Sequence, residues 1–148
     1  MGRQGETFEI LSVEDSAADT TLIRELMRQS RVVPLPHVEF VQDGQEMLDF
    51  LRNRADADHL PDLVLLDLNL PRKDGREALR EMRRDPRLRA IPVVVLTSSD
   101  RPEDVHGCYA NAANAYVTKP GDLEGFDAAL RQIESFWLSF VKLPTRAG

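Results

Sequence analysis

Short runs of apolar residues alternate along the chain with longer segments in which apolar residues recur every three or four positions. The apolar runs predict strands at residues 8–13, 38–41, 63–67, 92–96 and 115–118. The longer segments predict helices between the strands. Alternation of this kind is typical of βαβ units, in which the strands lie parallel in one sheet and helices cover both of its faces. We therefore expect an α/β fold with a doubly wound, five-stranded parallel sheet and five helices.

Four helix starts are marked by a polar residue that is followed three positions later by an acid. The first residue can accept a hydrogen bond from a free backbone N–H, and the acid interacts favourably with the positive end of the helix dipole. The four pairs are Ser16 with Asp19, Asp43 with Glu46, Asp74 with Glu77 and Asp100 with Glu103. The polar stretch 53–58 is the best loop candidate, and residues 1–7 and 145–148 are predicted to fray.

The last predicted helix carries an apolar stripe formed by Phe126, Leu130, Ile133, Trp137 and Phe140. Packing on the core accounts for its first three members. The ending 135–144, however, carries apolar residues around more of the helix than one core-facing stripe can cover. Exposed aromatic residues often mark interaction sites, and symmetric dimers are the commonest homo-oligomers. We expect a homodimer that uses Trp137 and Phe140 with neighbouring residues of the fourth and fifth helices; the alternative is a tail that folds back onto its own core.

Length and charge narrow the classes of protein. The 148 residues fit a single domain, 1–148, with a core over about 8–141 and no room for a second, output domain. The formal net charge of −6 and the pI near 5.1 argue against a nucleic-acid partner, so the arginines at 83, 84, 87 and 89 are interpreted as a solvated helix end. Cys108 stands alone, which excludes a disulfide framework and a cysteine metal site. Without a long apolar run or an apolar leader, the chain is expected to be cytoplasmic, with no membrane partner.

Polar side chains follow four of the predicted strands. Glu14 and Asp15 follow the first strand, Asp67 closes the third, Thr97 follows the fourth and Lys119 follows the fifth. Since parallel strands end at the same edge of a sheet, these groups should share one pocket, where open α/β sheets bind ligands. Carboxylate oxygens suit Mg²⁺, which one or two carboxylates usually hold together with phosphate oxygens and waters.

An aspartate at such an edge can also attack phosphorus and form an aspartyl phosphate. Lys119 can then offer a positive charge and Thr97 a hydroxyl to the phosphoryl oxygens, because phosphoryl transfer depends mainly on positioning and charge neutralisation. A single aspartate or threonine after a strand is more often a turn or cap residue. The joint pattern at four strand ends favours the functional interpretation.

Over residues 9–140 the chain resembles the response-regulator receiver domain of two-component signalling. The motifs that carry the resemblance are Val13-Glu14-Asp15-Ser16, Leu65-Leu66-Asp67-Leu68-Asn69-Leu70-Pro71 with Asp74-Gly75, Val95-Leu96-Thr97-Ser98 and Tyr116-Val117-Thr118-Lys119-Pro120. The resemblance implies a flavodoxin-like receiver fold, Asp67 as the phosphoacceptor, and Mg²⁺ held by Glu14, Asp15, Asp67 and the backbone carbonyl of Asn69. It further implies phosphate contacts by Thr97 and Lys119, a switch through Thr97 and Tyr116, a Lys119–Pro120 bond that is typically cis, and a sensor histidine kinase as partner.

A narrower resemblance concerns the small stand-alone receivers that partner bacterial phytochromes. It rests on Leu68-Asn69-Leu70-Pro71, the stretch 111–114 without glycine and the Phe136-Trp137 ending. It implies a bacteriophytochrome as the kinase, and receivers of this class often pair through the face that contains the last helix. Three features depart from the family pattern: Ser12 in the first strand, Ser98 after Thr97, and a longer segment 53–60. None of them removes a catalytic group.

Three other functions remain as alternatives. A metal-dependent phosphatase on this fold would need a further acid near the nucleophile, and Asn69 is not one; a flavin carrier would need a glycine-rich loop after the first strand, where 16–19 contains no glycine. A receiver that has lost phosphorylation and acts as a scaffold would lack some of the polar groups, and all of them are present. The favoured interpretation is a signalling receiver that catalyses only its own phosphorylation and dephosphorylation.

Overall fold

The computed structural model describes residues 7–144, which form one parallel sheet with helices on both faces. The strands lie in the order β2-β1-β3-β4-β5, which is the flavodoxin-like order, and every neighbouring pair is parallel. Their bounds are β1 (Glu9–Val13), β2 (His37–Val41), β3 (Leu63–Leu66), β4 (Val93–Thr97) and β5 (Ala115–Thr118). Each bound lies within one residue of the prediction, so the expected fold class is confirmed.

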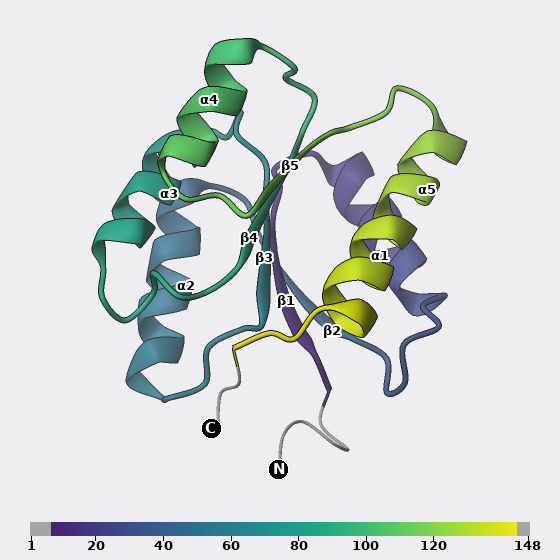
Figure 1. Ribbon diagram of the computed structural model, residues 1–148, viewed down its shortest axis with the longest axis horizontal. Helices are drawn as coiled ribbons and strands as arrows, with labels where there is room; N and C mark the ends of the chain where they lie inside the picture. The colour runs from purple at the N-terminus through teal and green to yellow at the C-terminus, as the bar shows by residue number, and fades with distance from the viewer. Residues whose placement is uncertain (1–6, 145–148) are drawn as a thin grey trace.

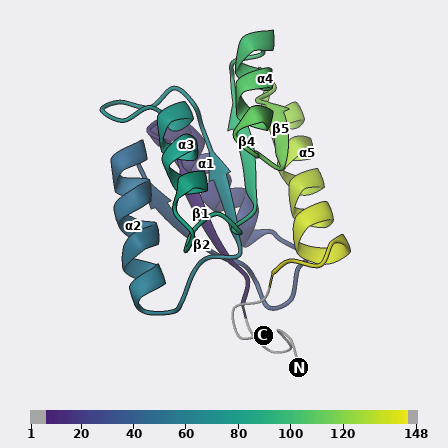
Figure 2. The ribbon, with the colours of Figure 1, turned by 60° about the vertical axis from the view of Figure 1, so that its left-hand side comes forward.

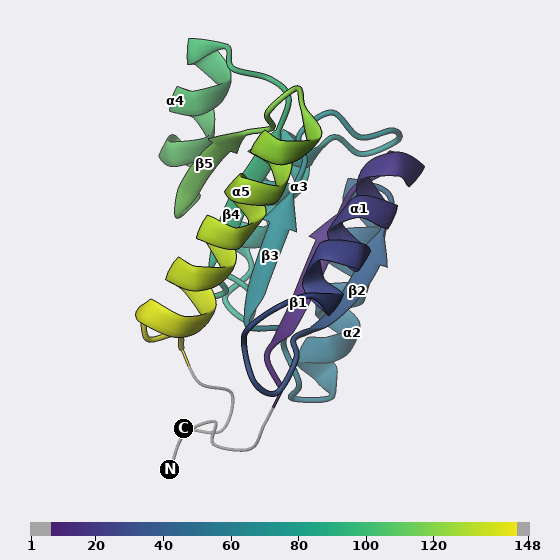
Figure 3. The ribbon, with the colours of Figure 1, turned by 90° about the vertical axis from the view of Figure 1, so that its right-hand side faces the viewer.

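The helices form two layers, one on each side of the sheet. Helices α2 (Gly44–Asp56), α3 (Gly75–Arg84) and α4 (Pro102–Ala110) cover one face, and α1 (Ala17–Arg28) and α5 (Leu123–Glu134) cover the other (Figure 1). Viewed from the second face, α1 and α5 lie side by side in front of the strands (Figure 3). Helix α4 lies beside β5 at the edge of the sheet (Figure 2).

Strand β3 shows how the apolar runs produce this three-layer arrangement. All four of its residues are buried, and successive side chains point to opposite faces of the sheet. Leu63 and Leu65 pack in the cluster that includes residues of α1 and α5, and Val64 and Leu66 pack in the cluster with α2 and α3. A strand that is covered on both faces must be apolar at every position, which is the pattern in the sequence.

Three of the four predicted helix caps are confirmed. Ser16 accepts a hydrogen bond from the backbone N–H of Asp19, Asp43 from that of Glu46, and Asp74 from that of Arg76. The cap predicted at Asp100 is wrong, because the helix begins one residue later, with Arg101 at the cap position and Pro102 in the first turn. Proline suits a first turn because its missing N–H would have no helical partner there.

The predicted loop at 53–58 and the predicted solvated arginines need correction. Helix α2 continues to Asp56, since Arg54 donates to Glu9 at 3.0 Å and to the carbonyl of His59 at 3.1 Å. At the end of α3, Arg83 is half-buried and donates to the carbonyls of Ala112 and Ile91. Arg83 therefore ties α3 to the turns that precede β4 and β5.

The end of the last helix differs from the predicted stripe. Phe126, Leu130 and Ile133 are buried as expected, but the helix then widens into a π-helical turn, η1 (Ser135–Phe140), in which the N–H of Val141 bonds to the carbonyl of Phe136 at 2.9 Å. This turn buries Leu138 and leaves Trp137 partly buried against the core, while Phe140 is 80% exposed. Part of the tail thus folds back, and part remains on the surface.

Three further expectations concern the backbone and the chain ends. The peptide bond between Lys119 and Pro120 is trans; in the described residues the cis bond joins Val33 to Pro34. Apart from Thr7, the ends that were predicted to fray lie outside the described residues. Within residues 7–144, no helix has both the length and the apolar character to cross a membrane.

Candidate functional site

Backbone pairing brings the predicted polar residues to one edge of the sheet. The backbone N–H of Glu14 bonds to Val41, that of Asp67 to Val13 at 3.1 Å, and that of Lys119 to Thr97 at 2.7 Å. Each of these residues is therefore held one step beyond its strand by the neighbouring strand. The site is built on the rigid end of the sheet, which fixes the relative positions of its side chains.

The carboxylate of Asp67 lies at the centre of the site. Its Oδ1 accepts a hydrogen bond from Oγ1 of Thr97 at 2.7 Å, and its Oδ2 accepts one from Nζ of Lys119 at 3.1 Å. The backbone N–H of Asn69 approaches Oδ1 at 3.4 Å. Asp67 is only 6% exposed, and both of its carboxylate oxygens accept hydrogen bonds.

Lys119 neutralises more than one carboxylate. Its Nζ donates to Glu14 at 2.6 Å and to Asp19 at 2.7 Å, in addition to Asp67. Burial acts to lower the pKa of Lys119, but the hydrogen bonds to Asp19 and Glu14 and the charge of Asp67 outweigh it, and the pKa lies above its usual range. Lys119 is therefore a permanent positive charge at this edge.

Glu14 is the acid whose ionisation is most strongly affected. Burial, together with the negative charge of Asp67, raises the pKa of Glu14 to about 7, against the opposing effect of Lys119. Its other oxygen accepts the backbone N–H of Ser16 at 3.1 Å. The site thus holds a carboxyl group that is only partly ionised near neutral pH.

The acids fit a divalent cation. Carboxylate oxygens of Glu14, Asp15 and Asp67 all lie within 4.8 Å of one another, with Asp15 exposed and the other two buried. With Asp19 the site has four carboxylates, three of which contact the ammonium of Lys119, so negative charge is in excess when all are ionised. An all-oxygen donor set with excess negative charge is the chemistry that Mg²⁺ and Mn²⁺ prefer.

Gly75 lets helix α3 approach the backbone that carries Asp67. A Cβ atom at this position would lie 2.2 Å from the carbonyl oxygen of Asp67 and 2.8 Å from Cα of Leu68. The backbone N–H of Gly75 also bonds to the carbonyl of Leu68 at 2.9 Å. The Asp74-Gly75 pair therefore caps the helix and fixes the loop behind the central carboxylate.

Tyr116 does not contact the carboxylates. Its hydroxyl donates to the backbone carbonyl of Ser99 at 2.8 Å, in the loop between β4 and α4. Because Ser99 lies two residues after Thr97, Tyr116 is linked to the site through that loop. Ser98, one of the three departures from the family pattern, is exposed.

The sequence predicted Asp19 only as an acid in the first turn of a helix, without a role in the site. In the structure it contacts Lys119, a residue 100 positions away. The available signal was its place in the first turn of the helix that directly follows Glu14 and Asp15, because that turn starts at the same edge of the sheet. Arg76, Asp104 and Ser99 were also missed, although they form a hydrogen-bonded group beside the site.

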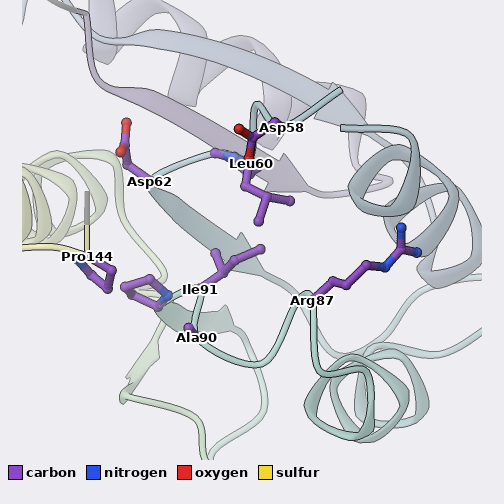
Figure 4. A pocket seen from close by; sticks show the side chains of 9 residues that line it. Asp58, Leu60, Asp62, Arg87, Ala90, Ile91 and Pro144 are labelled. Carbon is purple, nitrogen blue, oxygen red and sulfur yellow. The ribbon is translucent and has the colours of Figure 1, made fainter. Parts of the chain in front are cut away.

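A separate cavity of about 160 Å³ lies at the opposite end of the strands (Figure 4). Leu60, Ile91 and Pro144 line it, with Arg87 and Asp58 at its sides. Asp62 and Pro92, which precede β3 and β4, place this cavity at the amino ends of those strands. It is therefore distinct from the carboxylate site.

The family profile of the response regulator receiver domain matches residues 10–131 of the chain. This chain belongs to the response regulator receiver family. Receivers of this family are signalling proteins, and the acidic group around Asp67 occupies the carboxyl edge of the receiver sheet.

Relatives of this receiver match it over nearly its whole length. The response regulator Rcp1 of Synechocystis sp. is 42% identical over 137 residues, which cover 91% of this chain and 92% of Rcp1. The structure of the phosphorylated cyanobacterial phytochrome response regulator RcpA is 44% identical, with a TM-score of 0.87 over 94% of this chain and 99% of that chain. The Mn²⁺-bound form of Rcp1 is 41% identical, with a TM-score of 0.85 over 93% of this chain and 99% of that chain.

Proposed function

We propose that this receiver accepts a phosphoryl group on Asp67 from a sensor histidine kinase, in a reaction that depends on Mg²⁺. The observation that carries the proposal is the environment of the Asp67 carboxylate, which Thr97 and Lys119 hold from two sides at 2.7 and 3.1 Å. A carboxylate in fixed orientation beside a permanent positive charge suits attack on phosphorus.

Each residue of the site has a separate role in this proposal. An oxygen of Asp67 forms the new bond to phosphorus while the bond from phosphorus to the donor histidine nitrogen breaks, and that nitrogen keeps the electron pair. Lys119 offers its charge to one phosphoryl oxygen, and Thr97 offers its hydroxyl to another. Asp19 keeps Lys119 pointed toward Asp67.

Glu14, Asp15, Asp67 and the backbone carbonyl of Asn69 are the groups that would hold Mg²⁺. When bound, the ion offsets the negative charge that gathers between the carboxylate and the phosphoryl oxygens. One carboxylate oxygen from each of Glu14, Asp15 and Asp67 lies within 4.8 Å of the other two, which is close enough for all three residues to hold one ion. The Mn²⁺-bound structure of Rcp1 supports a divalent cation as the ligand class.

The output of phosphorylation is a change of protein–protein contacts. Thr97 exchanges its hydrogen bond to Asp67 for one to the phosphoryl group. This movement shifts the loop that carries Ser99, and Tyr116 moves with it because its hydroxyl is bonded to the Ser99 carbonyl. New charge-assisted hydrogen bonds from Lys119 and Thr97 supply the free energy for this change. The surface around α4, β5 and α5 is where partners would sense it.

The kinase partner is a bacteriophytochrome in this proposal. RcpA, named as a phytochrome response regulator, is 44% identical and aligns over 94% of this chain.

The chain also forms a homodimer through the end of its last helix. Phe136 and Phe140 are 46% and 80% exposed with ring centroids 5.8 Å apart, and a groove beside them is lined by Val117, Pro120, Ala129 and Trp137.

Intact-mass measurement after incubation with acetyl phosphate and Mg²⁺ tests the phosphorylation proposal. The wild type should gain one phosphoryl group, whereas Asp67→Asn should gain none, because the amide nitrogen is a poor nucleophile. Asp49→Asn, at an exposed site on α2, is the matched control and should be labelled like the wild type. Equal labelling of Asp67→Asn and the wild type would overturn the proposal.

A further inference from the structure

Arg76 joins the loop that follows Asp67 to helix α4. Its Nε and Nη2 donate to the two oxygens of Asp104 at 2.7 and 2.9 Å, and Nη1 donates to Asp74 at 2.8 Å. Nη2 also approaches Oδ1 of Asn69 at 3.4 Å. Two parallel bonds between a guanidinium and a carboxylate are strong and directional, so this pair fixes both partners.

Asp104 in turn fixes the second loop of the site. It is only 5% exposed, and besides Arg76 it accepts a hydrogen bond from the hydroxyl of Ser99 at 2.5 Å. The carbonyl of Ser99 accepts the hydroxyl of Tyr116. Asn69 lies two residues after Asp67, and Ser99 lies two residues after Thr97, on neighbouring strands. The Arg76–Asp104 pair therefore holds the two loops that border the central carboxylate.

Helix α4 depends on this pair because it has little apolar anchorage. Its buried residues are Asp104 and Cys108. A cavity of about 220 Å³ lies between α3 and α4, where Leu79, Gly107 and Asn111 contribute to its walls. The hydrogen bonds from Arg76 and Ser99 hold the pKa of Asp104 well below its usual range, so the pair is ionised at neutral pH.

We propose that Arg76 and Asp104 are positioning residues that set the lifetime of the acyl phosphate by holding Asn69 and Ser99 at the entrance to Asp67. This inference rests on the proposed function. Hydrolysis requires a water oxygen to attack phosphorus while the bond between phosphorus and the Asp67 carboxyl oxygen breaks, which releases inorganic phosphate and restores the carboxylate. Asp67 is 6% exposed, so the two loops decide how easily water reaches phosphorus. Arg76 and Asp104 act through these loops.

Asp104→Asn is the most informative variant, because it removes the charge but keeps the shape. Arg76, whose side chain is 31% exposed, can then turn to solvent. Phosphate loss, followed by intact mass after acetyl phosphate is removed, should be about threefold to tenfold faster than in the wild type, the size of effect typical for residues that act through their neighbours. Mg²⁺ affinity, measured by calorimetry, should change by less than the lifetime, because the three carboxylates of the acidic group are untouched and only the Asn69 carbonyl depends on this pair.

Three other variants complete the experiment. Arg76→Gln and Ser99→Ala should also shorten the lifetime, and Ser99→Ala, which removes only a hydroxyl, provides the test if Asp104→Asn fails to fold. Arg87→Gln is the matched control, since it breaks an exposed ion pair with Asp56 and should keep the wild-type lifetime.

The possible results separate this inference from the proposed function. Unchanged or longer lifetimes in Asp104→Asn and Ser99→Ala, with normal labelling, would overturn the inference alone, even if the unfolding temperature fell. A wild type that accepts no phosphate would overturn the proposed function and this inference with it. If the control Arg87→Gln lost phosphate as fast as Asp104→Asn, that result would also count against the inference.

Discussion

At the scale of single residues, the site balances four carboxylates against one ammonium. Lys119 stays charged, whereas Glu14 has a pKa of about 7, because burial and the charge of Asp67 disfavour its carboxylate. The folded protein therefore binds a proton at Glu14 more tightly than the unfolded chain, in which glutamate titrates near 4.5. Glu14 makes its full contribution to stability below about pH 4.5, and this contribution is lost as the pH rises to about 7.

Glu14→Gln should remove this pH dependence in metal-free protein. Between pH 5 and 7.5, the melting temperature of the wild type in chelator should fall relative to that of Glu14→Gln, whose amide does not titrate. One pKa unit corresponds to about 1.4 kcal/mol, and each kcal/mol to roughly 2–4 °C for a domain of this size. The difference between the two curves of melting temperature against pH reports the titration of Glu14 alone, because the histidines titrate in both proteins and cancel. Parallel curves would contradict the raised pKa.

The residues that the sequence could predict at the site are those that follow strands directly. Glu14, Asp67, Thr97 and Lys119 meet because strand order and register leave their side chains little freedom. Asp19 and Asp104 could not be assigned in the same way, since each lies on a helix whose rotation and tilt depend on packing against the whole sheet. A contact such as Asp19 to Lys119 is fixed by tertiary structure alone.

At the scale of elements, the contact between α3 and the loop after β3 is the most sensitive to substitution. Gly75→Ala would place a methyl group against the backbone at Asp67, and neither segment can move without displacing the carboxylate. We expect a loss of about 1–3 kcal/mol in the free energy of unfolding, as for other overpacked sites. Labelling of Asp67 by acetyl phosphate should also slow.

Gly107→Ala on α4 is the matched control for this substitution. A Cβ atom at Gly107 would meet nothing within 4 Å, so alanine should stabilise the helix by about 0.5–1 kcal/mol. Urea unfolding of the two variants gives the comparison. If both variants changed stability in the same direction, the close approach at Gly75 would not be the cause.

Elements were predictable where one physical signal dominated. The buried strands had uninterrupted apolar runs, and three caps had side chains of the right kind. The end of α2 was missed because Asn53–Asp56 is polar, and the contact of Arg54 with Glu9 joins segments 45 residues apart. The π-helical turn was missed because a single wide turn rotates the following side chains, which moves Leu138 rather than Phe140 into the core.

At the scale of the whole molecule, the exposed aromatic residues at the end of the last helix predict self-association. Sedimentation at micromolar concentration should show a wild-type dimer. Phe140→Ser should yield a monomer with an unchanged melting temperature, because Phe140 is 80% exposed and contributes little to the core. Trp137 is a poorer test, since it packs partly against the core and its loss would also lower stability.

Val33→Ser is the matched control for the dimer, since Val33 is 90% exposed but lies in the segment before β2. It should leave the dimer intact. A wild type that sediments as a monomer with and without phosphate would contradict the dimer, whereas equal dissociation of both variants would contradict the role of Phe140.

The two described ends of the chain lie on the side of the sheet away from the site. β1 starts there at Glu9, and Pro144 lies beside the cavity at the beginnings of β3 and β4 (Figure 1, Figure 4). A domain with neighbouring ends can be inserted into a surface loop of a host protein without stretching either chain. A fluorescent protein or an enzyme that carried this receiver as an inserted module would leave the carboxylate site facing away from the junction with the host.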